Sequence, residues 1–410
     1  MVLIQNIVRH SPRRVRDVGM ALVRAMHGYG APVHRLEATY AQVCEGQAVE
    51  GVLLAEPTSL VAIVEEGGEQ ASRVTRVGPS GFDLGRWASV EGIAYALASR
   101  DLSLEDAEVA LSAVAERRAP YSEWTVLAAH ACVAGTAVGF LGGGWAEVVV
   151  ATLIGWCVGG MSYWVRRVPS WSGVFESGAG FVAGVLASML LPILGPGSVA
   201  VATTAGLIGL VPGFTLTLAM TEVATHHLSS GTARLASAAG TFLALGFGVA
   251  IGGRVGAAWA GEAPLAVCMG LPEAWRWFAL GAGGCALGVL FGASRRDLMW
   301  ALFGACVADF GARIGGYWLG DEGAALLGAL AVGLAANTFA RLMNRPAALV
   351  EVPGIMVLVP GSVGLRSLTA LLSRDVVTGI EVGVSMMMTA AALVVGVLLA
   401  NVLVPPRGRI

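Results

Sequence analysis

The chain has 410 residues, of which 56% are hydrophobic and only 13% charged, and its net charge is −2. A soluble protein of this length is more polar, so the composition favours a membrane protein, and the near-zero charge offers no polybasic surface to nucleic acid. All 26 basic residues are arginine, and the absence of lysine excludes a P-loop and lysine Schiff-base chemistry. We therefore expect neither an enzyme nor a cofactor.

Residues 1–121 differ from the rest of the chain and predict a small cytoplasmic α+β domain, because they contain no apolar run long enough to cross a bilayer. Segments with helical spacing and short β-branched runs bounded by Gly, Pro and Glu alternate here. The predicted helices cover residues 11–30, 32–46, 84–100 and 102–118, and the predicted strands cover 49–56, 58–66 and 71–78. Ser103 is the expected N-cap of the last helix.

The rest of the chain consists of successive apolar runs of about 20 residues, the length that spans a bilayer. We predict ten transmembrane helices, at residues 124–143, 146–165, 173–193, 197–220, 232–253, 275–293, 298–316, 323–340, 347–372 and 379–403. Arginines concentrate in alternate connections, which predicts a multi-pass protein of the inner (plasma) membrane with both termini in the cytoplasm.

The tetrapeptide LVPG occurs twice, at residues 210–213 and 358–361, and the two copies align without a gap as far as Gly231 and Gly379. Because five spans separate the copies, the second enters the membrane from the opposite face. This spacing predicts two inverted five-helix halves, residues 122–256 and 274–410, joined by an extracytoplasmic connection at 257–273. In a chain with 57 glycines, two Pro-Gly matches can also arise by chance.

Proline and glycine inside a span break the helix and leave backbone polar groups unpaired, and lipid does not tolerate such groups. Two breaks related by a pseudo-twofold axis would therefore form a polar site near the midplane. The candidate substrate-binding residues are Pro212, Gly213, Thr215, Thr217, Pro360, Gly361, Ser362 and Arg366. The hydroxyl groups can equally serve helix packing, and Arg366 can equally extend to the outer interface.

Acidic residues inside spans are costly unless paired or hydrated, so Glu176, Glu222 and Asp309 are candidates for proton coupling. Arg313 follows Asp309 by four residues, which predicts an ion pair on one helix face. Glu176 and Glu222 show no partner nearby in the sequence, although both could also lie in the headgroup region. The six cysteines form no CxxC pair, which favours buried, inert thiols over disulfides or a metal site.

In these features the chain resembles the threonine/serine exporters, a family with a soluble module and a membrane module. The resemblance rests on "GYGAPVHRLEATY", "LVPGFTLTLAMTEVATHHLSSGTARLASA" and "VEVPGIMVLVPGSVGLRSL" in this order. The first segment contains the cytoplasmic-domain motif residues Arg35 and Glu37, either paired at the interface below the pore or engaged inside the soluble domain. Many family members carry Asn and Asp where this chain has Leu218 and Glu222.

The resemblance implies proton-coupled export of threonine, serine or a similar small amino acid, with the lipid bilayer as the other partner. Related split members look like dicarboxylate exporters, so a succinate-like substrate is the alternative. A passive channel or a membrane-bound sensor is the alternative from another functional class. Several GxxxG patterns predict close helix packing, and some of them could mediate a homo-oligomer.

Overall fold

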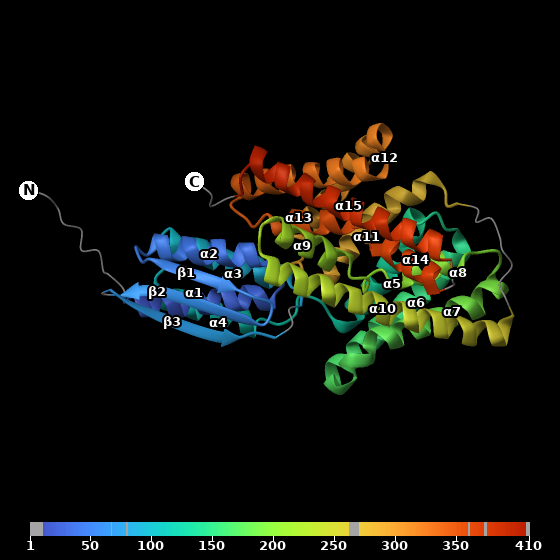
Figure 1. The fold of residues 1–410 in the computed structure, drawn as a ribbon, viewed down its shortest axis with the longest axis horizontal. Helices are drawn as coiled ribbons and strands as arrows, with labels where there is room; N and C mark the ends of the chain where they lie inside the picture. The colour runs from blue at the N-terminus through green and yellow to red at the C-terminus, as the bar shows by residue number, and fades with distance from the viewer. Residues whose placement is uncertain are drawn as a thin grey trace, which may run out of the picture.

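The computed structural model describes residues 11–66, 68–78, 81–261, 270–359, 361–372 and 375–406. Its N-terminal part is an α+β domain in which a three-stranded antiparallel sheet, in the order β1-β2-β3, packs against four helices (Figure 1). The elements are α1 (Pro12–Gly28), α2 (Val33–Gly46), β1 (Gly51–Ala55), β2 (Ser59–Glu66), β3 (Glu69–Arg76), α3 (Leu84–Ala98) and α4 (Leu104–Glu116).

The helices and strands of this N-terminal domain, which we call the soluble domain after its predicted environment, confirm the predicted elements. Local chemistry explains where its helices begin. The Ser103 hydroxyl accepts a hydrogen bond from the Asp106 N–H at 3.1 Å, and the Asp83 carboxylate accepts one from the Arg86 N–H at 2.9 Å. Each side chain satisfies a backbone donor that the first helical turn leaves unpaired. The alternating residues Leu60, Ala62 and Val64 of β2 are buried against the helices, as a half-buried strand requires.

The remaining helices form an elongated bundle that extends away from the soluble domain (Figure 1). They are α5 (Glu123–Phe140), α6 (Trp145–Arg167), the short 3₁₀ helix η1 (Pro169–Val174), α7 (Phe175–Leu194), α8 (Val199–Gly206), α9 (Gly213–Ala224), α10 (Leu228–Ala260), α11 (Glu273–Leu290), α12 (Leu298–Met343), α13 (Ala348–Leu358), α14 (Gly361–Leu372) and α15 (Val376–Leu403). Six helical segments among the described residues are long and apolar enough to cross a membrane. The protein is therefore a polytopic helical membrane protein.

Two features of this bundle bear on the predicted spans. The 46-residue α12 bends at Gly320, whose φ of 73° and ψ of −160° are not helical, so it runs as two helices joined at this point. Both LVPG segments interrupt a helix: α8 and α9 are separated by residues 207–212, and α13 and α14 by residues 359–360. The predicted helix breaks are confirmed, although Pro360 itself lies outside the described residues.

The two breaks meet in space through their glycines. A Cβ atom placed on Gly213 would lie 2.8 Å from the Gly361 Cα and 2.1 Å from a methyl carbon of Val359. A Cβ placed on Gly361 would lie 3.2 Å from the Gly213 Cα. Only hydrogen fits at either position, so glycine permits the two backbones to touch where the first and second membrane regions cross.

Glycine also sets the packing of α7 against α10, which confirms the close packing predicted from the GxxxG patterns. Cβ atoms on Gly180 and Gly184 would lie 2.3 and 2.5 Å from the carbonyl oxygens of Leu245 and Val249. Reciprocally, a Cβ on Gly252 would lie 2.1 Å from the Phe181 carbonyl oxygen. The cysteines within the described residues are free thiols, but the expectation that they are buried holds only for Cys44, because Cys132, Cys157 and Cys285 are partly buried and Cys306 is exposed; Cys268 lies outside the described residues.

The soluble domain is fused to the membrane bundle by a shared hydrophobic core. Buried residues of α1 to α4 pack in one cluster with Phe339 of α12 and with Leu349 and Val350 of α13. The Leu84 N–H donates to the Phe291 carbonyl at 2.7 Å, which connects the start of α3 to the end of α11. The soluble domain is thereby held in place at one end of the bundle (Figure 1).

The glycine crossing predicts a specific sensitivity to added volume. Gly213→Ala should destabilise the protein by roughly 1–3 kcal/mol, because its methyl group would overlap the backbone of the opposite break. The matched control is Gly240→Ala on α10, where a Cβ meets nothing within 4 Å. Thermal scans of monodispersity in detergent measure the difference, and equal midpoints for the two variants would contradict the crossing.

Candidate functional site

A cavity of about 370 Å³ lies between the soluble domain and the membrane bundle. Its walls come from α2 and α3 on the soluble side and from α9, α12, α13 and α15 on the membrane side. The polar or aromatic residues that line it are His34, Arg35, Gln42, Trp87, Phe214, Thr217, Thr221, Thr225, His227, Asn337, Glu351 and Asn401. We call it the inner cavity, because it opens beneath the domain predicted to be cytoplasmic.

Threonine hydroxyl groups line the α9 wall of the inner cavity at intervals of four residues. Thr217, Thr221 and Thr225 donate to the carbonyl oxygens of Gly213, Thr217 and Thr221, at 3.2, 3.0 and 2.9 Å. Each hydroxyl therefore uses its proton within the helix and keeps acceptor capacity for a ligand. Such a ladder suits the ammonium or hydroxyl group of a small polar molecule.

Acidic groups outnumber basic groups around Arg35 at the inner cavity. Arg35 pairs with the buried Glu91 at 3.2 Å, and Glu351 lies near enough to act on the Arg35 charge. Although burial alone would lower the pKa of Arg35, the neighbouring Glu91, Tyr95 and Glu351 raise it. Within the described residues, no cation is in ion-pairing contact with Glu351. Two carboxylates thus face one guanidinium, which leaves the cavity able to accept a positive charge.

Two further groups shape the walls of the inner cavity. Trp87 is 4% exposed, and its indole N–H is buried without an acceptor in the described part of the chain. Buried donors normally find partners, so this N–H is available to a ligand acceptor. Opposite it, the Asn337 amide donates to Asn401 and to the Val404 carbonyl, each at 2.8 Å, and ties α12 to α15.

Glu222 lies next to the inner cavity at the junction of the two domains and is completely buried. Its two carboxylate oxygens both accept from the Arg234 Nε at 3.0 Å, and one also accepts from the Ser230 hydroxyl at 2.7 Å. The Val33 N–H at the start of α2 donates to the same carboxylate at 3.4 Å. The expectation that Glu222 lacks a nearby partner is wrong: α10 follows α9 closely enough to bring Arg234 alongside.

A second contact between the domains involves Glu37. Its carboxylate lies 3.0 Å from the His227 Nε2 and accepts from the Ala55 N–H at 3.1 Å, while the His227 Nδ1 lies 3.0 Å from the Thr225 hydroxyl. The two motif residues therefore have different partners. Glu37 contacts His227 of the membrane bundle, whereas Arg35 pairs with Glu91 inside the soluble domain, so the two motif residues do not form one ion pair with each other. A role for either residue at the interface below the pore stays a prediction.

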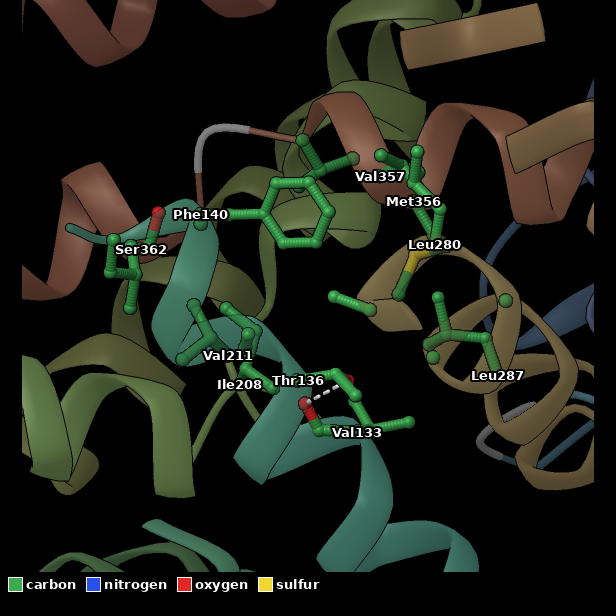
Figure 2. A pocket seen from close by; sticks show the side chains of 17 residues that line it. Val133, Thr136, Phe140, Ile208, Val211, Leu280, Leu287, Met356, Val357 and Ser362 are labelled. Carbon is green, nitrogen blue, oxygen red and sulfur yellow. Dashed lines mark hydrogen bonds between the residues drawn. The ribbon is translucent and has the colours of Figure 1, made fainter. Parts of the chain in front are cut away.

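A smaller cavity of about 130 Å³ lies on the other side of the glycine crossing. Figure 2 shows its mostly apolar lining, with Phe140 from α5, Leu280 from α11 and Met356 from α13. Thr136 contributes little polarity, because its hydroxyl donates to the carbonyl oxygens of Cys132 and Val133 at 2.7 and 3.1 Å. We call this space the central cavity.

Comparisons with known proteins agree with this architecture. A sequence model described as "Putative threonine/serine exporter" matches residues 17–256, and another, described as "Threonine/Serine exporter, ThrE", matches residues 280–403. The chain belongs to the threonine/serine exporter family. No solved structure matches the chain.

Relatives of this exporter-family chain include fungal membrane proteins. "Pheromone-regulated membrane protein 10" of Eremothecium gossypii is 26% identical over 95% of the chain and 56% of its own length. The protein of the same name in Saccharomyces cerevisiae is 23% identical over 95% of the chain and 54% of its own length. The chain therefore spans about half the length of these curated relatives.

The predicted substrate residues are divided between the two cavities. Thr217 lines the inner cavity, whereas Gly361 and Ser362 line the central one. Gly213 lies between them at the crossing, with Pro212 preceding it as the buried N-cap of α9. Thr215 lines neither cavity, because it lies two residues from Thr217 and so faces a different direction. Arg366 is exposed and also lines neither.

The other predicted acids occupy different surroundings. Glu176 is half-buried in the first turn of α7, where the helix dipole stabilises a carboxylate. Asp309 is buried and pairs with Arg313 at 3.2 Å, which confirms the predicted pair, and it also pairs with Arg276 of α11. Proton coupling through Glu176, Glu222 or Asp309 stays a prediction.

Sequence reasoning missed the largest contributors to the inner cavity. No sequence pattern identified Trp87 or Asn401 as cavity residues, because nothing in the sequence places α3 or the end of α15 at the same cavity as α9. Thr225 could have been found from the sequence, because it follows Thr217 and Thr221 at steps of four residues, which places all three on one helix face. Glu351 lies seven residues before the second LVPG segment, but only the structure shows that it shares Arg35 with Glu91.

The Glu222 cluster predicts a strong structural effect. Glu222→Gln leaves the partly buried Arg234 without its counter-charge and should destabilise the protein by roughly 3–5 kcal/mol. The double variant Glu222→Gln/Arg234→Gln should recover much of this loss, because the unpaired charge is gone. Thermal stability in detergent measures both.

The matched control is Glu176→Gln, because that carboxylate is partly exposed at a helix end and should change stability by no more than about 0.5 kcal/mol. Wild-type stability of Glu222→Gln would show that the carboxylate does not hold Arg234 in place.

Proposed function

We propose that the protein is a secondary transporter that exports threonine, serine or a similar small amino acid across the plasma membrane, driven by protons. The observation that carries the proposal is the inner cavity with Glu351 in its wall, a carboxylate that shares the Arg35 guanidinium with Glu91. Its volume of about 370 Å³ falls within the roughly 300–1,000 Å³ typical of small-molecule sites. Family membership supports the class, and the chemistry of the cavity supports the substrate.

The proposed binding mode follows from the charges and donors at the cavity. The substrate ammonium binds Glu351 and the hydroxyl acceptors of Thr217 and Thr221, while its carboxylate takes the indole N–H of Trp87 near Arg35. Two carboxylates around one guanidinium attract a cationic group and repel a dianion. This arrangement favours an amino acid over a succinate-like dicarboxylate.

The same carboxylate provides a route to proton coupling. Glu351 can hold either a proton or the substrate ammonium, so loading one displaces the other, as exchange of protons for exported substrate requires. Glu222 and Asp309 suit this role less well because each is already held by arginine. We therefore place the coupling step at Glu351.

The proposed architecture has ten spans in two inverted halves, residues 122–256 and 274–410, joined by an extracytoplasmic segment at 257–273. The cytoplasmic domain, residues 1–121, covers the inner mouth, and both termini are cytoplasmic. Contact between the two LVPG glycines supports this arrangement, because inverted repeats place their broken helices together at the substrate path.

Counterflow in proteoliposomes tests the proposal, with labelled threonine outside and unlabelled threonine, serine or succinate inside. Threonine or serine inside should drive accumulation. Glu351→Gln should raise the KM for threonine roughly 10- to 100-fold, since a hydrogen bond to a charged group contributes about 1.5–3 kcal/mol. It should also make the remaining flux insensitive to a pH gradient.

The matched control is Glu381→Gln, an exposed acid at the start of α15, which should leave KM unchanged. Counterflow of succinate with threonine inert would contradict the substrate and favour the dicarboxylate alternative. Flux without counterflow would indicate a channel, and binding without flux would indicate a sensor.

A further inference from the structure

A third cavity, of about 240 Å³, adjoins the central one on the side away from the soluble domain. The two share Phe140 and Ala279 in their linings. The other residues that line the third cavity are Gly139, Leu271, Pro272, Glu273, Trp275, Arg276 and Arg313. We call it the outer cavity. Phe140 therefore lies between the apolar central cavity and the charged outer cavity.

Two guanidinium groups line the outer cavity, and they share a single buried carboxylate. Arg276 and Arg313 share one carboxylate, Asp309, with the Arg313 Nε at 3.2 Å. The Nε of Arg276 is buried and has no acceptor in the described part of the chain. Glu273 also faces the cavity from the exposed first turn of α11, so the acceptor-free Arg276 Nε, and not the net charge of the cavity, marks the place for a carboxylate. A carboxylate entering the cavity would find free donors there.

The ring of Phe140 is held beside these donors. The Arg276 guanidinium lies 5.6 Å from its centroid, within the range of a cation–π contact. Figure 2 shows the same ring among the side chains that line the central cavity. Movement of one side chain would therefore both open the central cavity and release Arg276.

We propose that the outer cavity is the second mouth of the transport path, where Arg276 and Arg313 receive the substrate carboxylate and Phe140 closes the passage behind it. The carboxylate-receiving role rests on the proposed function, whereas the closure by Phe140 concerns the shape of the protein alone. The substrate class is a small zwitterion. Its ammonium leaves Glu351 at the inner cavity, and its carboxylate is then bound at the outer one.

Thiol accessibility tests the closure without requiring any transport. In a cysteine-free background, Ser362→Cys reports from the central cavity and Leu271→Cys from the outer cavity. A membrane-impermeant, charged thiol reagent is applied to the face opposite the soluble domain. Leu271→Cys should react at once, whereas Ser362→Cys should react at least tenfold faster when Phe140→Ala is added.

The matched control is Phe278→Ala, which removes an exposed phenylalanine from α11 and should leave the reaction rate of Ser362→Cys unchanged. Equal reactivity of Ser362→Cys with and without Phe140, or reaction only from the face of the soluble domain, would overturn the closure. Neither result depends on which substrate the protein carries, so it stands apart from the counterflow outcome.

Protection of Leu271→Cys tests the carboxylate site. Threonine should slow its labelling, whereas threoninamide, which lacks the carboxylate, should not. Arg276→Gln should abolish protection while keeping the fold, because Arg313 still pairs with Asp309. Arg254→Gln, on the exposed surface near the end of α10, is the control. Equal protection by threonine and threoninamide, or protection that survives Arg276→Gln, would overturn the site.

Discussion

The contact between Gly213 and Gly361 determines how the rest of the membrane bundle is arranged. A broken helix exposes backbone N–H and C=O groups, and no such group can face lipid. Placing two breaks against each other hides both from lipid at once and requires that neither carry a side chain. The central cavity is lined by residues of both breaks, among them Val211 and Val359, whereas the inner cavity is lined by the helices α9 and α13 that flank the breaks.

The soluble domain depends on the same crossing through α9. That helix starts at Gly213 and ends beside the soluble domain, where Glu222 accepts from the first turn of α2. Arg234 fixes this carboxylate from α10, so the contact is held from three elements. The soluble domain therefore closes one side of the inner cavity, and any shift of α9 would change its contact with α2.

The sequence predicted the elements well and the site only in part, for a physical reason. Hydrophobic periodicity, caps and the two LVPG segments are local signals, and they located the helices, the strands and both breaks. Partners brought together by tertiary packing leave no such signal. Trp87 and Asn401 are more than 300 residues apart in sequence and line one cavity only because α3 packs on α13 and α15 packs on α9. Asp309 shows both cases, since Arg313 was visible four residues away and Arg276, on another helix, was not.

The polarity of the three cavities is consistent with the zwitterionic substrate that we propose. The inner cavity offers a carboxylate, the outer cavity offers guanidinium donors, and the passage between them is apolar. A dianion would be repelled at the first, and a simple cation would gain nothing at the last. A molecule that carries both charges would meet an oppositely charged group at each end, and the apolar passage between them would oppose its crossing, because entering the passage strips water from both charges.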